Sequence, residues 1–191
     1  KYRLEIWAYC LLPNHVHFVC VPGAKDSLAR AFNTLHMRYA QYFNGKRFIY
    51  GHLWRARFMS CALDEPTVRE EIRFVETNPV RIGIVQRAED YPWSSARSHV
   101  TGIPDPLLAV GFFPREAIPD WRAFLEGRGD GDVIDRVRQR LKTGRPAGDA
   151  SFVRELEKLL DQRAQPLRLP AGDREVLVAL LIGDPALLEL Q

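Results

Sequence analysis

The stretch Leu11-Leu12-Pro13-Asn14-His15-Val16-His17-Phe18-Val19-Cys20 predicts a strand. Side chains on a strand alternate between its two faces with a period of two residues. His15 and His17 therefore point to the same face, and Val16 points to the other. Two imidazoles at this spacing can bind one divalent metal ion, because imidazole is a ligand for many transition metals. The alternative is two surface histidines on a half-exposed strand.

The composition is that of a globular protein of 191 residues, with 46% hydrophobic residues and a net charge of +3. No apolar run reaches the ~18 residues that span a bilayer, and no leader pattern is seen. The cysteines, Cys10, Cys20 and Cys61, are odd in number and lack zinc-type spacing, so we expect buried thiols in a reducing compartment. These features predict a cytoplasmic protein with no membrane partner.

Positive charge is concentrated in the first third of the chain, where residues 1–57 hold nine Lys and Arg against two acids. Such a segment favours a polyanionic partner. Basic and aromatic residues interleave at its end, and this pattern suits nucleic acid, because arginine neutralises phosphate and aromatic rings stack on unpaired bases. The alternative is that these aromatics belong to the core. The candidate DNA-binding residues are Arg38, Tyr42, Lys46, Arg47, His52, Trp54, Arg55 and Arg57.

Hydrophobic spacing predicts strands and helices in the same chain, which is an α+β class. Strand-like sequence covers Leu4–Cys20, and a further strand is predicted at Met59–Leu63. A helix is expected at about residues 28–44, with Ser27 as its N-cap.

A second helix is predicted at residues 68–78. Thr67 and Glu70 form a capping-box pattern at its start, and Pro79 ends it. Phe74 and Asn78 are four residues apart, so they share one face of this helix, one turn apart.

The region after about residue 114 changes character, because glycine and charged residues dominate it. We predict a core at residues 1–113, a linker at 114–132 and a C-terminal helical extension at 133–191. The extension is expected to hold amphipathic helices at 133–141 and 151–160, the second capped by Asp149, and a third helical piece at Asp173–Ile182. Two roles are possible for this extension. It either packs on the core or on a partner subunit, or it contacts nucleic acid.

Four motifs occur in order: Leu12-Pro13-Asn14-His15-Val16-His17, Gly51-His52-Leu53-Trp54-Arg55-Ala56-Arg57-Phe58, Asn78-Pro79-Val80-Arg81-Ile82-Gly83 and Tyr91-Pro92-Trp93-Ser94-Ser95. Together they resemble the single-tyrosine HUH transposases, above all the REP-associated tyrosine transposases. The similarity covers about residues 4–110, and the tail is similar to the C-terminal extension of many members. One such motif is a weak signal, whereas four in this order are specific.

The resemblance implies a ferredoxin-like or RRM-like fold, an antiparallel sheet with helices on one face. In this family two motif histidines on a central strand hold Mg or Mn. A helix beside the sheet carries a tyrosine nucleophile and, one turn later, a third polar metal ligand. The tyrosine attacks a phosphodiester, and the substrates are imperfect hairpins from palindromic repeats. The expected partner is therefore single-stranded or hairpin DNA.

His15 and His17 match the metal pair of the family, and Asn78 matches the third ligand, since an amide oxygen is a ligand for a hard cation. Such an ion would act as a Lewis acid on the phosphate. Phe74 occupies the tyrosine position and has no oxygen with which to attack phosphorus. Phe74 is either a nucleophile removed by substitution or the residue of a naturally inactive member. A third interpretation is that Tyr39 or Tyr42 replaces the missing nucleophile.

A second departure lies at the N-terminus, because family members usually have a further strand and helix before the position of Leu4. A sheet that lacks a strand exposes an edge. We expect either a core that lacks its first strand and helix, or one that a partner chain completes as a homodimer.

Three functions are compared. The first is a transposase-family protein that binds single-stranded or hairpin DNA, with metal-dependent cleavage and rejoining lost or blocked at Phe74. The second is a non-catalytic, domesticated relative that recognises palindromic repeats. The third is a metal-dependent hydrolase in which His15 and His17 activate water. It would need further acidic or histidine ligands, and Glu76 faces away from Asn78 by helical spacing.

Overall fold

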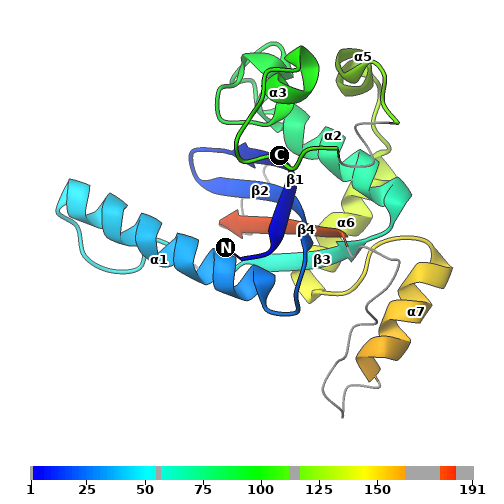
Figure 1. Cartoon of the computed structure of the whole chain (residues 1–191), viewed down its shortest axis with the longest axis horizontal. Coiled ribbons are helices and arrows are strands. Elements are labelled where there is room, and N and C mark those ends of the chain that lie inside the picture. Colours follow the sequence, from blue (N-terminus) through cyan, green and yellow to red (C-terminus); the bar gives the residue numbers. More distant parts are fainter. Residues whose placement is uncertain (1, 55–56, 112–116, 162–176, 184–191) are drawn as a thin grey trace.

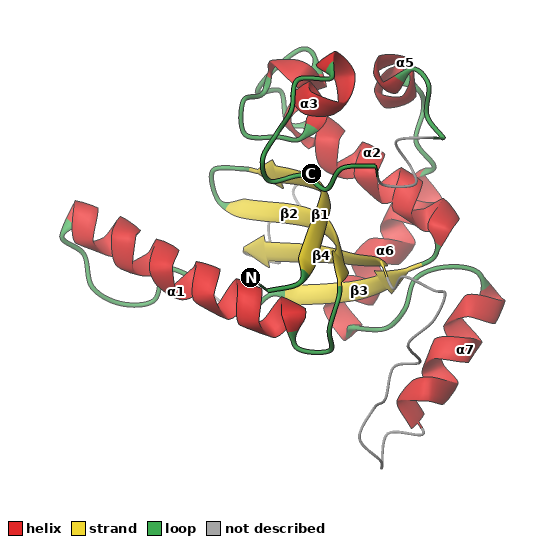
Figure 2. Cartoon of the chain, in the orientation of Figure 1, coloured by secondary structure: helices red, strands yellow, loops and turns green. Residues whose placement is uncertain are grey.

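The computed structural model describes residues 2–54, 57–111, 117–161 and 177–183. It contains a four-stranded antiparallel sheet in the order β1-β2-β4-β3, surrounded by helices (Figures 1 and 2). The predicted α+β class with an antiparallel sheet is therefore confirmed. The strands are β1 (Leu4–Leu11), β2 (His15–Pro22), β3 (Met59–Leu63) and β4 (Leu177–Gly183). The helices are α1 (Ser27–Arg47), α2 (Glu65–Arg81), the short 3-10 helix η1 (Ala88–Asp90), α3 (Ala96–Thr101), α5 (Trp121–Glu126), α6 (Gly131–Thr143) and α7 (Ala150–Asp161).

The stretch from Leu11 to Cys20 holds the end of β1, the turn of the β1–β2 hairpin and most of β2. The backbone N–H of Leu12 donates to the carbonyl of His15 at 2.9 Å and closes a tight turn through Pro13 and Asn14. Beyond the turn the side chains of β2 alternate as predicted. Those at 15, 17, 19 and 21 face one core, and those at 16, 18 and 20 face another.

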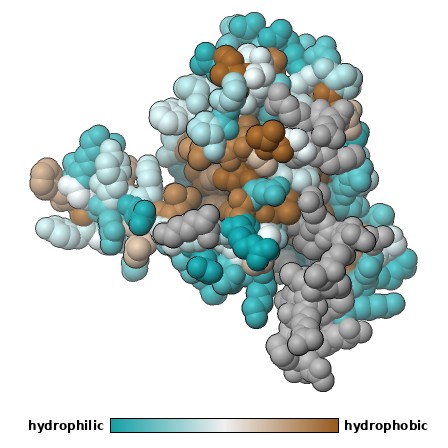
Figure 3. Space-filling model, viewed as in Figure 1, coloured by the Kyte–Doolittle hydropathy of each residue, from teal (hydrophilic) through white to brown (hydrophobic). Residues whose placement is uncertain are grey.

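The two faces of the sheet are covered differently. α2 and α6 pack on the histidine face, where Val19, Ile72 and Val137 belong to one buried cluster. The first turns of α1 pack on the opposite face through Phe32, against Phe18. The resemblance implied helices on one face of the sheet only. α2 and α6 lie on one face, and α1 covers part of the opposite face. Figure 3 shows hydrophobic side chains still exposed at the centre of the viewed face, beside α1.

The prediction of a helix at Asp173–Ile182 is wrong for residues 177–182, which belong to β4. β4 pairs with β2 on one edge and with β3 on the other. A short, unbroken apolar run suits such a doubly paired strand, and its hydrophobic spacing alone cannot separate it from a buried helix. β4 therefore lies between β2 and β3 and joins them into one sheet, with β1 and β3 as its outer strands. Residues 173–176 lie outside the described residues.

The ends of α2 differ from the prediction. Asp64 is its N-cap and accepts from the backbone N–H of Thr67 at 3.0 Å, so Thr67 is inside the helix. Pro66 lies in the first turn, where a missing N–H costs nothing. The helix continues through Pro79 to Arg81, because a proline near the C-terminal end removes one hydrogen bond and leaves the rest of the last turn intact.

The C-terminal region joins the same core. The predicted linker contains α5, whose Trp121 and Leu125 are buried one turn apart and whose start is capped by Asp120. α6 contacts α2, β3 and β4. The helices predicted at 133–141 and 151–160 are confirmed as α6 and α7, and Asp149 caps α7 through the backbone N–H groups of Ser151 and Phe152. Across the described ranges no helix has the length and apolar character to cross a membrane.

Candidate metal centre and nucleic-acid surface

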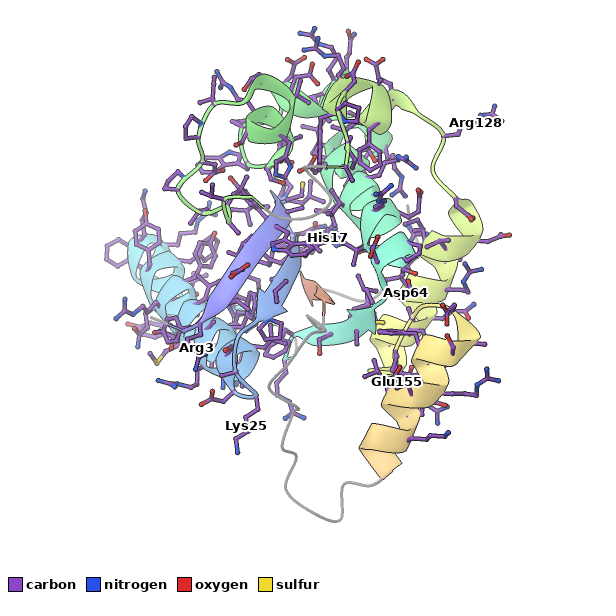
Figure 4. All side chains as sticks on the ribbon, turned by 45° about the vertical axis from the view of Figure 1, so that its right-hand side comes forward. Arg3, His17, Lys25, Asp64, Arg128 and Glu155 are labelled. Carbon is purple, nitrogen blue, oxygen red and sulfur yellow. The ribbon has the colours of Figure 1, made fainter. Side chains whose placement is uncertain are left out.

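His15 and His17 lie side by side on β2, as predicted. Both side chains are buried, and their ring centroids are 4.9 Å apart. Figure 4 shows His17 where the β1–β2 hairpin meets α2. Two buried imidazoles on one strand need a partner for their polar nitrogen atoms, because a buried polar group without one is costly.

α2 brings Phe74 and Asn78 to the same place. The Asn78 Nδ2 atom lies 3.0 Å from His17 Nε2. The Phe74 ring meets the His17 ring nearly at right angles, with 5.7 Å between centroids. The predicted common face of Phe74 and Asn78 is therefore confirmed, and it is turned toward the histidine pair.

The two imidazoles are in the state that a metal ligand requires. Burial lowers the pKa of His15 and, more strongly, that of His17, where the charges of His15, Arg81 and Arg138 lower it further. Both rings are thus neutral near pH 7 and keep a lone pair for a cation. His15 Nδ1 pairs with Asn14 Oδ1 at 2.6 Å, which fixes the orientation of that ring.

The residues fit a divalent cation, because Asn78 Oδ1 is buried and has no hydrogen-bond partner among the described residues. It offers an oxygen beside the His17 nitrogen, and an amide oxygen with imidazole is an acceptable donor set for Mn²⁺ or Mg²⁺. Within the described residues there is no group of three or more His, Cys, Asp and Glu side chains suited to a metal ion. The candidate set is instead two imidazoles and one amide.

Two arginines border Phe74, the position to which the resemblance assigns a nucleophile. The guanidinium carbon of Arg81 lies 4.3 Å from the centroid of the Phe74 ring, and that of Arg138 lies 5.0 Å from it. Arg81 lies in the motif at residues 78–83, but the sequence alone assigned no role to it. Arg138 comes from α6, and no local pattern links it to residue 74.

Glu71 is a buried carboxyl group that sequence reasoning missed, although it lies three residues before Phe74 on the same helix. Burial raises its pKa from the usual 4.5 to about 7, against the opposing charges of Arg138 and Arg81. Cys61 on β3 is the further titratable group that faces it. The i, i+3, i+7 spacing of Glu71, Phe74 and Asn78 is the signal that could have identified it.

We expect Glu71→Gln to change how stability depends on pH. Between pH 4.5 and 7 the folded chain keeps a proton on Glu71 that the unfolded chain has lost, so the wild-type free energy of unfolding falls as pH rises through this window. The loss is on the order of 3 kcal/mol and is absent in the variant. Urea unfolding at pH 4.5 and pH 8 measures it. The exposed Glu65 supplies the control Glu65→Gln, and an equal pH dependence in both variants would contradict the assignment.

Glu76 on α2 is fully buried and points away from Asn78, as its helical spacing predicted. Its carboxylate accepts from Ser95 Oγ, from His99 Nδ1 at 2.6 Å and from Trp121 Nε1 at 2.7 Å. It therefore joins α2 to α3 and α5 and fixes the rotation of α2. Because these contacts satisfy the carboxylate, it does not serve as a ligand for the histidine pair.

The candidate DNA-binding residues of α1 form an exposed row. Arg38, Tyr42 and Lys46 are spaced by four residues and share a face, and Lys46 Nζ lies 3.4 Å from the Tyr42 hydroxyl. Arg47, His52 and Arg57 are also exposed, and Arg55 lies outside the described residues. In Figure 1 this end of α1 projects from the body of the protein.

Trp54 has a packing role in the structure. Its ring stacks on His36 with 4.7 Å between centroids, and its Nε1 donates to the His36 carbonyl at 3.2 Å. Tyr39 packs against the same indole, which favours the core-edge interpretation of that tyrosine. Phe48 and Tyr50, which follow α1 directly, are 90% and 101% exposed and offer their rings to solvent together with Tyr42.

The three cysteines are free and buried, as expected. Burial raises the pKa of the Cys10 and Cys61 thiols to about 12 and that of Cys20 further still. All three are thus protonated near neutral pH, and none has the thiolate character of a nucleophile or metal ligand.

Comparison with known proteins gives one distant relative. The chain is 28% identical over 105 residues to a Haemophilus influenzae protein named "Putative REP-associated tyrosine transposase". The match covers 49% of this chain and 60% of the relative. No protein-family model and no solved structure matches the chain. The chain therefore spans about three fifths of the length of the relative that it matches.

Proposed function

We propose that this chain binds single-stranded or hairpin DNA and holds Mg²⁺ or Mn²⁺ through His15, His17 and Asn78. The observation that carries the proposal is the meeting of His17 from β2 with Phe74 and Asn78 from α2 at one buried point. The named relative supports the DNA partner.

Each residue of the proposed site has a separate role. An ion held by the three ligands would draw negative charge from a phosphodiester. His15 and His17 stay neutral to bind it, and Asn14 orients the His15 ring. The resemblance assigns the attacking oxygen to residue 74, and such an oxygen has to come within about 3.5 Å of phosphorus to react. Phenylalanine there supplies no nucleophile, so the chain binds DNA without forming a covalent link to it.

Phe74 itself favours the second candidate, a non-catalytic relative that recognises palindromic repeats. A DNA-binding protein needs the basic surface and the aromatic rings and has no need of a phenol at residue 74. The two candidates differ in whether the rest of the site still works when a tyrosine is restored at residue 74.

We expect DNA binding to weaken steeply with salt, because phosphate contacts release counterions. Fluorescence anisotropy with a labelled hairpin that carries a single-stranded flank measures the slope of log affinity against log salt. The double substitution Lys46→Gln/Arg47→Gln removes two exposed cations of α1 and should lower that slope by about 1.5.

The matched pair for this experiment is Arg154→Gln/Lys158→Gln, two exposed cations of α7. We expect it to leave the slope unchanged. If the α7 pair lowers the slope and the α1 pair does not, DNA lies on the C-terminal helices and the α1 assignment is wrong. A flat salt profile for the unmodified chain would contradict the DNA proposal as a whole.

A further inference from the structure

A cavity of about 530 Å³ opens beside Phe74, and none of its lining residues belongs to β2. Its walls come from α2, from the segment that follows α2, from α5 and from α6. Phe74, Arg81 and Arg138 line one end of it. The ring that stands in the nucleophile position is therefore part of the wall of a second space, which the metal site does not use.

The arginines that line this cavity differ in how completely acidic groups neutralise them. Arg73 is held by Glu70 at 2.7 Å and by the Phe124 carbonyl, and Arg87 and Arg122 pair with the acids Glu89 and Asp90. Arg138 meets Asp135 through Nη1 alone, at 3.3 Å, and Asp135 is largely exposed. The positive charge that remains is concentrated at the Phe74 end.

The guanidinium of Arg138 has a free edge. Its Nε and Nη2 atoms are buried, and no residue in the described part of the chain forms a hydrogen bond with them. These two atoms form the lateral edge of the group, whose parallel N–H bonds match two oxygens of a phosphate or carboxylate. A buried donor without a partner is costly, so an anion at this edge would satisfy both donors at once.

Arg81 adds a second cation at the same place. It lies over the same ring as Arg138, and burial together with the charge of Arg138 lowers its pKa. The two like charges repel each other, and a bound anion near both would reduce that repulsion. Glu71 and Asp135 are the acids that face Arg81, and Glu71 holds its proton up to about pH 7.

We propose that this cavity is a phosphate-binding site in which Arg138, through its lateral edge, and Arg81 hold a phosphate group of a bound DNA strand. The assignment of the phosphate to DNA rests on the proposed function, whereas the site itself does not. A phosphate held here lies beside residue 74, and the strand that carries it is thereby positioned against the metal ligands.

The test uses the full chain with ¹⁵N-labelled arginine, and follows the Nε–H resonances by NMR. Inorganic phosphate, thymidine monophosphate and the oligonucleotide (dT)6 are titrated in turn, with no metal added. We expect all three to shift the Arg138 resonance. Arg138→Gln should weaken binding of each at least about tenfold, as loss of a charge-assisted bidentate contact does.

Two further variants separate the phosphate site from a general effect of charge or folding. Arg138→Lys keeps the charge and loses the paired edge, and should weaken phosphate binding nearly as much. Arg136→Gln removes an exposed arginine from the same helix and should change nothing. Equal affinities in Arg138→Gln and Arg136→Gln, with cooperative melting retained in both, would overturn the proposal.

The remaining outcomes distinguish a phosphate of DNA from free phosphate, and the phosphate site from the hairpin function. If inorganic phosphate and the mononucleotide shift Arg138 and (dT)6 does not, the site binds free phosphate and the DNA assignment falls. If the hairpin binds tightly and Arg138→Gln leaves that affinity unchanged, the proposed function stands and the phosphate site is wrong. If phosphate and (dT)6 shift Arg138 while the hairpin fails to bind, the site stands and the hairpin function falls.

Discussion

Phe74→Tyr is expected to turn a chain that only binds DNA into one that becomes covalently attached to it. The new hydroxyl is placed at the far end of a ring that contacts His17 and lies beneath Arg81 and Arg138. Nearby positive charge favours a phenolate, which is the attacking form. In the reaction the tyrosine oxygen bonds to phosphorus, the bond from phosphorus to the 3′ oxygen breaks, and that oxygen leaves as a free 3′-hydroxyl after taking up a proton.

The measurement is a denaturing gel of labelled hairpin DNA incubated with Mn²⁺. A pool of imperfect hairpins with varied flanks is used, so that no single target need be known. The matched control is Phe124→Tyr, because that ring also lies under an arginine, Arg73, at 4.2 Å. Phe74→Tyr should give a shifted protein–DNA band, and Phe124→Tyr and Phe74→Tyr/His17→Ala should give none.

Two results would contradict this prediction. A band from the unmodified chain would mean that another residue, such as Tyr39 or Tyr42, is the nucleophile. Absence of a band from Phe74→Tyr, with hairpin binding and Mn²⁺ binding intact, would leave the non-catalytic relative as the function. In that case residue 74 would be a packing position beside a DNA surface.

Glu76→Ala is expected to destabilise the protein by about 3–5 kcal/mol, as loss of one partner of a buried charged network does. The substitution leaves the Ser95 hydroxyl, the His99 ring and the Trp121 indole without their common acceptor. Glu76→Gln keeps one acceptor oxygen and should cost less, in the range of 1–3 kcal/mol.

Urea unfolding measures both effects, with the exposed Glu65→Ala as a control expected to cost less than about 1 kcal/mol. Because Glu76 lies two residues before Asn78, we expect the surviving folded fraction of Glu76→Gln to bind Mn²⁺ less tightly as well. A cost below about 1 kcal/mol for Glu76→Ala would show that other contacts fix α2.

The local part of the candidate site could be predicted from the sequence. Strand alternation placed His15 and His17 on one face, and helical spacing placed Phe74 and Asn78 on another. Neither rule says that the two faces meet. That step came from the resemblance to a family, and the 3.0 Å separation of Asn78 Nδ2 and His17 Nε2 confirms the meeting.

The parts that sequence reasoning missed depend on long-range contacts. The apolar run of β4 is compatible with a buried helix or a buried strand, and its pairing with β2 and β3 makes it a strand. Arg138 reaches Phe74 from a helix more than sixty positions away, so no spacing rule could associate them. Trp54 was assigned to DNA because aromatic and basic residues alternate around it, whereas its contact with His36 requires the fold.

We propose above that His15, His17 and Asn78 form a divalent metal site. Isothermal titration of the unmodified chain with Mn²⁺ tests it most directly, compared with His17→Ala and with the exposed control His52→Ala. We predict one bound Mn²⁺ per chain, a loss of affinity in His17→Ala of at least tenfold (about 1.4 kcal/mol), and no change in His52→Ala. Equal Mn²⁺ affinity in the unmodified chain and in a folded His17→Ala would contradict the account.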